Sequence, residues 1–230
     1  MFESVVKYLR RKTDPIDLLG KLAPPTTKLK TLVHVGAHIA QERSHYESHG
    51  YENILWIEGS AEIHQRLVKI LADHQGPARH HAYHGLLADH DDQEIELRMF
   101  SNDGMSSSIY APTEESLSRW PAVTETGRTE SAVTRTLDSV LSGTEFEGNC
   151  DTLVVDVQGA ELLVLRGAEK TVASANAVIA EVSTVPYYQG GVMFDELKAH
   201  LEQRGFVPMS VPRRHGDMLF LRRELAKAAA

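Results

Sequence analysis

Short apolar runs alternate with amphipathic stretches through the first third of the chain. The β-branched run Thr31–Val35 predicts a strand, and residues 39–49 after it have the spacing of a helix. The same pair recurs at 53–57 and 61–74, and a third strand is predicted at 78–84. Strands that alternate with helices favour a parallel sheet, because each helix carries the chain back to the start of the next strand.

The middle of the chain has a different pattern. Residues 94–100 alternate charged and apolar side chains, which predicts a half-exposed, antiparallel strand. Residues 101–128 are rich in Ser, Gly, Thr and Pro, and we expect them to loop over the sheet with a short helix at 114–120. Residues 133–141 predict a short strand and a turn of helix.

The segment from Asp151 to Ala168 carries the most information. Thr152–Val155 predicts a strand that is buried on both faces, as in a parallel sheet. Asp156 follows this run, and the turn-like pair Gln158–Gly159 separates it from an apolar pattern of helical period. An acid at the carboxyl end of such a strand lies where open α/β sheets bind their ligands.

The remaining elements complete an α/β pattern. A strand at 177–180 ends at Glu181, and a helix is predicted at 194–203. Residues 206–211 and 218–221 predict a hairpin, followed by a helical tail at 224–230. The whole order predicts an open, Rossmann-like α/β sheet, mostly parallel, with a C-terminal antiparallel hairpin and helices on both faces.

The N-terminal region is amphipathic and helical in pattern, and Pro24–Pro25 interrupts it. We therefore predict an N-terminal helical extension at 1–25 and one main domain at 26–224. Phe2, Val5, Val6 and Leu9 share one helical face, which predicts packing on the domain or on a second subunit in a homodimer. Attachment to a membrane surface is the alternative.

Composition narrows the class of protein. A net charge of -8 disfavours a nucleic-acid partner. The single cysteine, Cys150, excludes an internal disulfide and a cysteine-rich zinc site. No apolar run approaches the roughly 20 residues of a membrane span, and the start of the chain lacks the features of a signal peptide. We expect a cytoplasmic protein.

Two predicted strand ends have the chemistry of a nucleoside site. Gly36 follows the first strand, where it would let a ligand approach the backbone at a helix N-terminus. Only one of three fingerprint glycines is present there, which argues against a dinucleotide-dependent oxidoreductase. Glu58 ends the second strand, about 20 residues later, the separation at which an acid meets a ribose diol. The alternative role for Glu58 is to favour the dipole of the next helix.

Asp156 and Glu181 form a second candidate group. Both follow inner strands of the predicted sheet, so their carboxylates would lie side by side. Either one could accept a proton, or the two could share a divalent metal such as Mg²⁺. Capping of nearby backbone N–H groups is the structural alternative. We interpret the crowded histidines at 74, 80, 81, 84 and 90 as surface residues, because their spacing matches no zinc signature.

Six blocks of the chain resemble a known family. These blocks, in order, are similar to those of FkbM-type methyltransferases, which have the class I S-adenosylmethionine-dependent fold. They span about Leu32 to Phe206 and read VHVGAH, WIEGS, LLAD, TRTLDSVL, DTLVVDVQGAELLVLRGA and VIAEVSTVPYYQGG.

The resemblance implies S-adenosylmethionine-dependent O-methylation of a hydroxyl on a sugar or natural-product-like small molecule. It implies that Gly36, Ala37 and His38 line the methionine end of the cofactor. Glu58, followed by Gly59, would hold the ribose, and the turn from Leu86 to Asp89 would lie near the adenine. Asp156, followed by Val157, would face the transferred methyl group. Asp156 and Glu181 also resemble the paired acids that hold magnesium in other methyltransferases of this fold.

Three positions depart from the family pattern. His34 stands where an acid is usual, Ala40 where a glycine is usual, and Val154 where a lysine is common. These departures leave open a catalytically altered, methyltransferase-like binding or scaffold protein. The flexible, polar loops at 104–108 and 187–191 are candidates to cover the acceptor.

Overall fold

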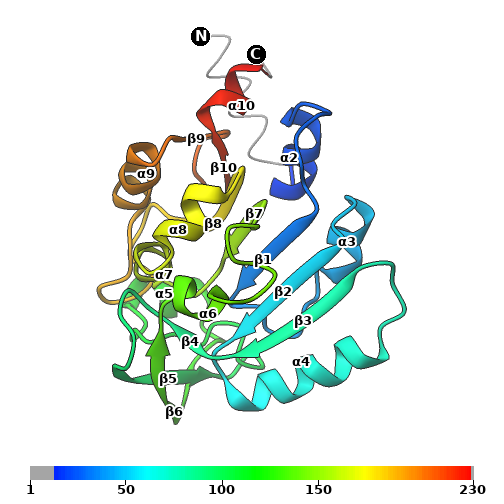
Figure 1. Cartoon of the computed structure of the whole chain (residues 1–230). Coiled ribbons are helices and arrows are strands. Elements are labelled where there is room, and N and C mark those ends of the chain that lie inside the picture. The colour runs from blue at the N-terminus through cyan, green and yellow to red at the C-terminus, as the bar shows by residue number, and fades with distance from the viewer. Residues whose placement is uncertain (1–12, 229–230) are drawn as a thin grey trace.

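Seven strands form the main sheet, in the order β3-β2-β1-β7-β8-β10-β9 (Figure 1). The structure is a computed structural model, and it describes residues 13–228. The inner strands run parallel, whereas β10 is antiparallel to both of its neighbours, as the predicted C-terminal hairpin requires. The strands are β1 (Thr31–Val35), β2 (Asn53–Glu58), β3 (Arg79–His84), β7 (Thr152–Val155), β8 (Ala177–Ser183), β9 (Phe206–Pro208) and β10 (His215–Arg222).

Alternate residues of the inner strands enter two apolar clusters, one on each face of the sheet. Val33 and Val35 belong to one cluster, whereas Leu32 belongs to the other. The first face is covered by α6 (Leu137–Leu141), α7 (Glu161–Arg166), α8 (Glu169–Ser174) and α9 (Phe194–Gln203). The second is covered by α2 (Pro15–Leu22), α3 (Arg43–Ser48) and α4 (Ala61–Asp73). The predicted α/β fold with helices on both faces is therefore confirmed.

A second, smaller sheet has the order β4-β6-β5. It contains β4 (Leu86–Leu87), β5 (Glu94–Phe100) and β6 (Glu125–Arg135). The antiparallel pairing predicted for 94–100 is confirmed, since β5 pairs with β6. The predicted loop at 101–128 ends earlier, because its last residues already pair with β5. It contains α5 (Glu114–Arg119), which confirms the short helix.

The helix predicted from Ile39 begins later, at Arg43. His38 and Ala40 both have positive φ angles, of 46° and 54°, and these left-handed residues turn the backbone instead of starting a helix. The strand predicted to end at Glu181 continues to Ser183, because β10 pairs along its whole length.

One helix of the predicted N-terminal helical region lies within the described residues. The helix α2 confirms helical structure before the break at Pro24, and its residues Ile16, Leu18 and Leu19 enter the second apolar cluster. The predicted apolar face at Phe2 to Leu9 lies outside the described residues. At the other end of the chain, α10 (Arg223–Ala228) confirms the helical tail as far as it is described. Among residues 13–228, no helix has the length and apolar character needed to cross a bilayer.

The order of the strands fixes where a ligand can bind. From β1 the chain moves outward to β2 and β3 on one side of the sheet, and later to β7 and β8 on the other side. The connections after β1 and β7 therefore leave in opposite directions. Open α/β sheets bind ligands in the crevice that this reversal creates at the carboxyl ends of the strands.

Candidate functional site

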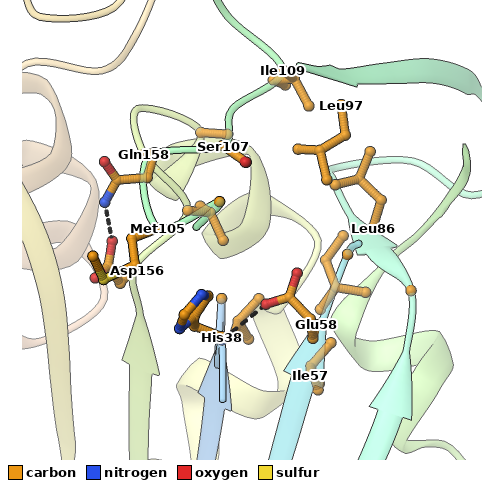
Figure 2. A pocket seen from close by; sticks show the side chains of 18 residues that line it. His38, Ile57, Glu58, Leu86, Leu97, Met105, Ser107, Ile109, Asp156 and Gln158 are labelled. Atoms are coloured by element: carbon orange, nitrogen blue, oxygen red, sulfur yellow. Dashed lines mark hydrogen bonds between the residues drawn. The ribbon is translucent and has the colours of Figure 1, made fainter. Parts of the chain in front are cut away.

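A pocket of about 620 Å³ lies at the carboxyl ends of β1, β2 and β7. Figure 2 shows Asp156 and Gln158 on one side of it and Glu58 and Leu86 on the other. The second sheet supplies further walls, through Leu86 of β4 and Leu97 of β5. The residues that line it are Val35, Gly36, His38, Ile57, Glu58, Gly59, Gly85, Leu86, Leu87, Leu97, Gly104, Met105, Ser107, Ile109, Asp156, Val157, Gln158 and Ala160.

Gly36 brings the two sides of the pocket together. Its φ angle is 84°, and a Cβ atom at this position would lie 1.7 Å from the backbone oxygen of Asp156. The N–H groups of Gly36 and Ala37 both donate to the carbonyl oxygen of Ile57, at 2.9 and 3.0 Å. Only glycine permits this close approach of the turns that follow β1 and β7.

Glu58 is held as a hydrogen-bond acceptor at the pocket wall. Its Oε2 accepts the N–H of His38 at 2.8 Å, and its Oε1 accepts the N–H of Ser60 at 2.8 Å. The residue is 8% exposed, and burial raises its pKa while these N–H groups act in the opposite direction. Each carboxylate oxygen has a second lone pair, so Glu58 can still accept hydrogen bonds from a ligand in the pocket.

Gln158 links the two predicted acids. Its Nε2 donates to Asp156 Oδ1 at 2.6 Å and to Glu181 Oε2 at 3.0 Å. Its Oε1 accepts the hydroxyl of Tyr188 at 2.6 Å. Gln158 makes these three hydrogen bonds from a left-handed backbone, with a φ angle of 55°. The amide thus lies between Asp156 and Glu181, in the position that a cation shared by these two carboxylates would need.

A third acid, the buried Glu161, completes a carboxylate cluster with the half-buried Asp156 and Glu181. One oxygen from each lies within 4.8 Å of the others. Burial, followed by the neighbouring Glu181, raises the pKa of Asp156 well above its usual range, and burial does the same for Glu181. Burial raises the pKa of Glu161 to about 7. Each of these carboxyl groups therefore loses its proton at a higher pH than an ordinary one, and His215 Nε2 lies 3.1 Å from Glu181 Oε1.

The loop after β5 forms the upper wall of the pocket (Figure 2). Arg66 of α4 binds it through both oxygens of Asp103, at 2.8 and 2.6 Å. His38 Nε2 donates to the carbonyl oxygen of Asp103 at 2.9 Å. The loop at 104–108 is a predicted cover of the acceptor, and its residues Gly104, Met105 and Ser107 line the same pocket as Glu58. No local pattern indicated this, because the loop reaches the site through the second sheet.

A second pocket, of about 420 Å³, lies beyond Gln158. Gln158 lines both pockets, and the second one also includes Tyr188, Trp120 and His215. Trp120 and His215 pack together with Tyr187, with ring centroids 4.8 to 5.3 Å apart. This arrangement provides an apolar platform with polar groups at its edge, next to the carboxylate cluster.

The structure brings most of the predicted site residues together. Seven of them line the first pocket: Gly36, His38, Glu58, Gly59, Leu86, Asp156 and Val157. Ala37 is 1% exposed and packs in the apolar core, and Asp89 lies outside the pocket, where it pairs with His90. Glu181 is next to the pocket and reaches it through Gln158.

His34 faces away from this pocket. Its ring packs against Tyr46 and Trp56 in the cluster on the second face, and its Nδ1 lies 3.2 Å from the Tyr46 hydroxyl. Burial lowers its pKa to about 3, so the imidazole is neutral. Ala40 is fully buried and has a left-handed backbone, which favours glycine. This gives a physical reason why the resembled family usually has glycine at this position.

Comparisons with known proteins bear on the site. A family model described as the methyltransferase FkbM domain matches residues 34–208. The chain is similar to the crystal structure of methyltransferase FkbM from Methylobacillus flagellatus, with a TM-score of 0.52 and 14% identity over 90% of this chain. That alignment covers 48% of the other chain, so this protein spans about half of its length.

A second similar structure is TrmK from M. capricolum, solved in complex with S-adenosyl-homocysteine. Its TM-score is 0.48, at 6% identity, and the alignment covers 91% of this chain and 68% of the other. No curated protein matches the chain.

Proposed function

Because the chain belongs to the FkbM methyltransferase family, we propose that it transfers a methyl group from S-adenosyl-L-methionine to a hydroxyl of a small, carbohydrate-like or natural-product-like acceptor. One observation carries this proposal. Glu58 and Asp156 face a single pocket from opposite sides of the Gly36 turn. A carboxylate that can bind a ribose and one that can accept a proton therefore lie on the same edge of the sheet.

The residues of the pocket fit the cofactor. The Glu58 carboxylate has free lone pairs for a ribose diol, and Leu86, Leu97 and Ile109 offer an apolar slot for an adenine ring. The absence of a Cβ atom at Gly36 allows the ligand to approach the backbone. When bound, the cofactor would supply an activated methyl group on a sulfonium.

Asp156 is the proposed general base. Once deprotonated, a carboxyl group with a raised pKa holds a transferred proton more strongly than an ordinary one, which suits it to accept the proton of an acceptor hydroxyl. Gln158 fixes the position of this carboxylate, and Glu181 raises its pKa through charge repulsion. The pocket beyond Gln158 is the proposed acceptor site, because Trp120 and His215 lie there beside the acids.

Isothermal titration with S-adenosylhomocysteine tests the proposal most directly. We expect binding of one molecule per chain with micromolar affinity. No heat of binding at millimolar ligand would refute a cofactor site in this pocket. A screen of hydroxylated acceptors with labelled cofactor then tests transfer, and bound cofactor without transfer to any acceptor would favour the binding-protein alternative.

Glu58→Ala is expected to weaken binding of S-adenosylhomocysteine at least tenfold, or about 1.4 kcal/mol. The loss follows from removal of the acceptor for the ribose hydroxyls. Thermal unfolding of the same variant is the control, since Glu58 also accepts two backbone N–H groups. A folded variant with wild-type affinity would place the ribose elsewhere.

Magnesium is not part of this proposal, because the Gln158 amide donates to both Asp156 and Glu181. We expect full turnover in the presence of a chelator. Loss of turnover that added Mg²⁺ restores would instead favour the shared-metal alternative.

A further inference from the structure

Two clusters of histidine and carboxylate lie on the second face of the sheet, away from the pocket. One consists of Asp17, His45 and His49, and the other of Glu47, His74 and His80. In each, one ligand atom per residue lies within 4.8 Å of the others. The two clusters differ in how their imidazole rings are hydrogen-bonded, and this difference decides which one can bind a metal.

The rings of the Glu47 cluster cannot offer Nε2 to a metal. Trp56 Nε1 donates to His80 Nδ1 at 2.9 Å, and Arg43 Nε donates to His74 Nδ1 at 3.4 Å. A neutral imidazole whose Nδ1 accepts a hydrogen bond carries its proton on Nε2. Both Nε2 atoms face Glu47, at 3.1 Å from its Oε1, and donate to it. This cluster is a closed hydrogen-bond network that joins α3, the end of α4 and β3.

The Asp17 cluster has the opposite arrangement. His45 and His49 lie one helical turn apart, and both present Nε2 to Asp17 of α2. In the described part of the chain both rings make their hydrogen bonds through Nε2, to Asp14 and Asp17, so either ring can carry its proton on Nδ1 and leave Nε2 free as a ligand. The two side chains are 39% and 25% exposed, which gives a cation access.

The distances from Asp17 to the two imidazole nitrogens are close to those around a tetrahedral ion, and all three ligand atoms lie within 4.8 Å of one another. Zinc bonds to nitrogen and oxygen of about 2.0 to 2.2 Å place neighbouring ligands about 3.4 Å apart. Asp17 Oδ1 lies 3.3 Å from His45 Nε2 and 2.9 Å from His49 Nε2. Asp14 adds a second carboxylate, whose Oδ1 lies 3.3 Å from His45 Nε2. Two carboxylates together balance the charge of a divalent cation.

We propose that Asp17, His45 and His49 form a Zn²⁺ site that fastens α2 to α3, with Asp14 beside it. Bound metal would cross-link the helix nearest the start of the described chain to the body of the domain. Borderline divalent ions such as Zn²⁺ favour imidazole with carboxylate, whereas Mg²⁺ favours oxygen ligands alone.

The test uses the full chain, without an affinity tag, after treatment with EDTA and dialysis. Titration with ZnCl₂ in a calorimeter should show one site per chain. His45→Ala and His49→Ala should each weaken binding at least tenfold, and Asp17→Asn, which keeps the side-chain shape, should weaken it as well. His74→Ala, in the other cluster, is the matched control and should keep wild-type affinity.

A second readout does not depend on calorimetry. Zn²⁺ should raise the thermal midpoint of the wild-type protein and slow amide exchange in α2, because it binds the folded state only. Neither effect should occur in His45→Ala/His49→Ala, whose folding is checked by its own unfolding transition. No binding by the wild type, binding that survives the double substitution, or binding that His74→Ala removes would each overturn the proposal.

Discussion

Gly36 is the residue that the site depends on most. The two turns meet at its Cα, and a methyl group would overlap the backbone oxygen of Asp156. We predict that Gly36→Ala destabilises the protein by at least about 3 kcal/mol, from overpacking and a left-handed backbone together. Gly143→Ala is the control. Its φ angle is 75° with nothing within 4 Å, so it should cost only about 1 kcal/mol. Urea unfolding measures both, and equal losses would contradict the predicted clash.

Asp156 gives the second prediction at this scale. Asp156→Asn keeps the acceptor for Gln158 but cannot take a proton, so we expect turnover to fall at least about a hundredfold. Binding of S-adenosylhomocysteine should be kept, which separates catalysis from folding. Rates that fall together with cofactor affinity would instead point to a structural role.

The pH profile of the wild-type protein tests the environment of this acid. A base works when deprotonated, and the raised pKa of Asp156 moves the rise in turnover to higher pH than for an ordinary carboxyl. Glu181→Gln removes the neighbouring negative charge, so it should lower the pKa of Asp156 and shift the profile toward acid. An unshifted profile would mean that another group controls the rate.

The sequence predicted Glu58 and Asp156 because each directly follows a buried apolar run, and runs of this kind fix where parallel strands end. It missed the role of Gln158, since a polar residue in a turn gives no sign of its φ angle or of its hydrogen bonds to Asp156 and Glu181. The family resemblance implied that Ala37 and Asp89 also lie at the cofactor, whereas Ala37 is buried in the core and Asp89 lies outside the pocket. Side-chain direction in the two turns decides these positions, and periodicity does not extend into turns.

At the scale of elements, the strands of the main sheet were predictable, whereas the wall made by the second sheet was not. Residues 94–100 alternate clearly, but their partner strand lies 25 or more residues away in the chain. The pattern therefore predicts a strand without saying what it covers. Leu97, Met105 and Ile109 reach the pocket only through this long-range pairing. The predicted helix start at Ile39 is wrong, because nothing in the sequence marks His38 and Ala40 as left-handed residues.

The loop after β5 offers a test at this scale. Arg66→Ala removes both hydrogen bonds to Asp103, and we expect cofactor affinity to fall about three- to tenfold, mainly through faster dissociation. Stability should change by less than about 1 kcal/mol, because the pair is exposed. Arg128→Ala, which breaks an exposed ion pair between β6 and α4 away from the pocket, is the matched control. Stopped-flow measurement of cofactor dissociation distinguishes the two variants. Equal dissociation rates would show that other contacts hold the loop.

At the scale of the whole molecule, the carboxylate cluster couples folding to pH. It joins the turn after β7, the start of α7, and β8, with His215 and Asp217 of β10 alongside. Glu161 Oε1 accepts the N–H groups of Val157 and Gly159, at 3.1 and 3.0 Å, so its carboxyl is fixed inside this junction. Carboxyl groups with raised pKa values are enriched at ligand-binding sites, and this cluster lies between two pockets.

Glu161→Gln measures what this arrangement costs the fold. Burial raises the pKa of Glu161 from 4.5 to about 7, so the folded protein binds a proton that the unfolded chain has released. The contribution of Glu161 to the free energy of unfolding is therefore complete below pH 4.5 and is lost as the pH rises to about 7. The loss from this group is up to about 3 kcal/mol. Glutamine can accept the same two N–H groups and does not titrate. Urea unfolding at pH 5 and pH 8 should therefore show a smaller loss in the variant, whereas parallel losses would mean that Glu161 is ionised in both states.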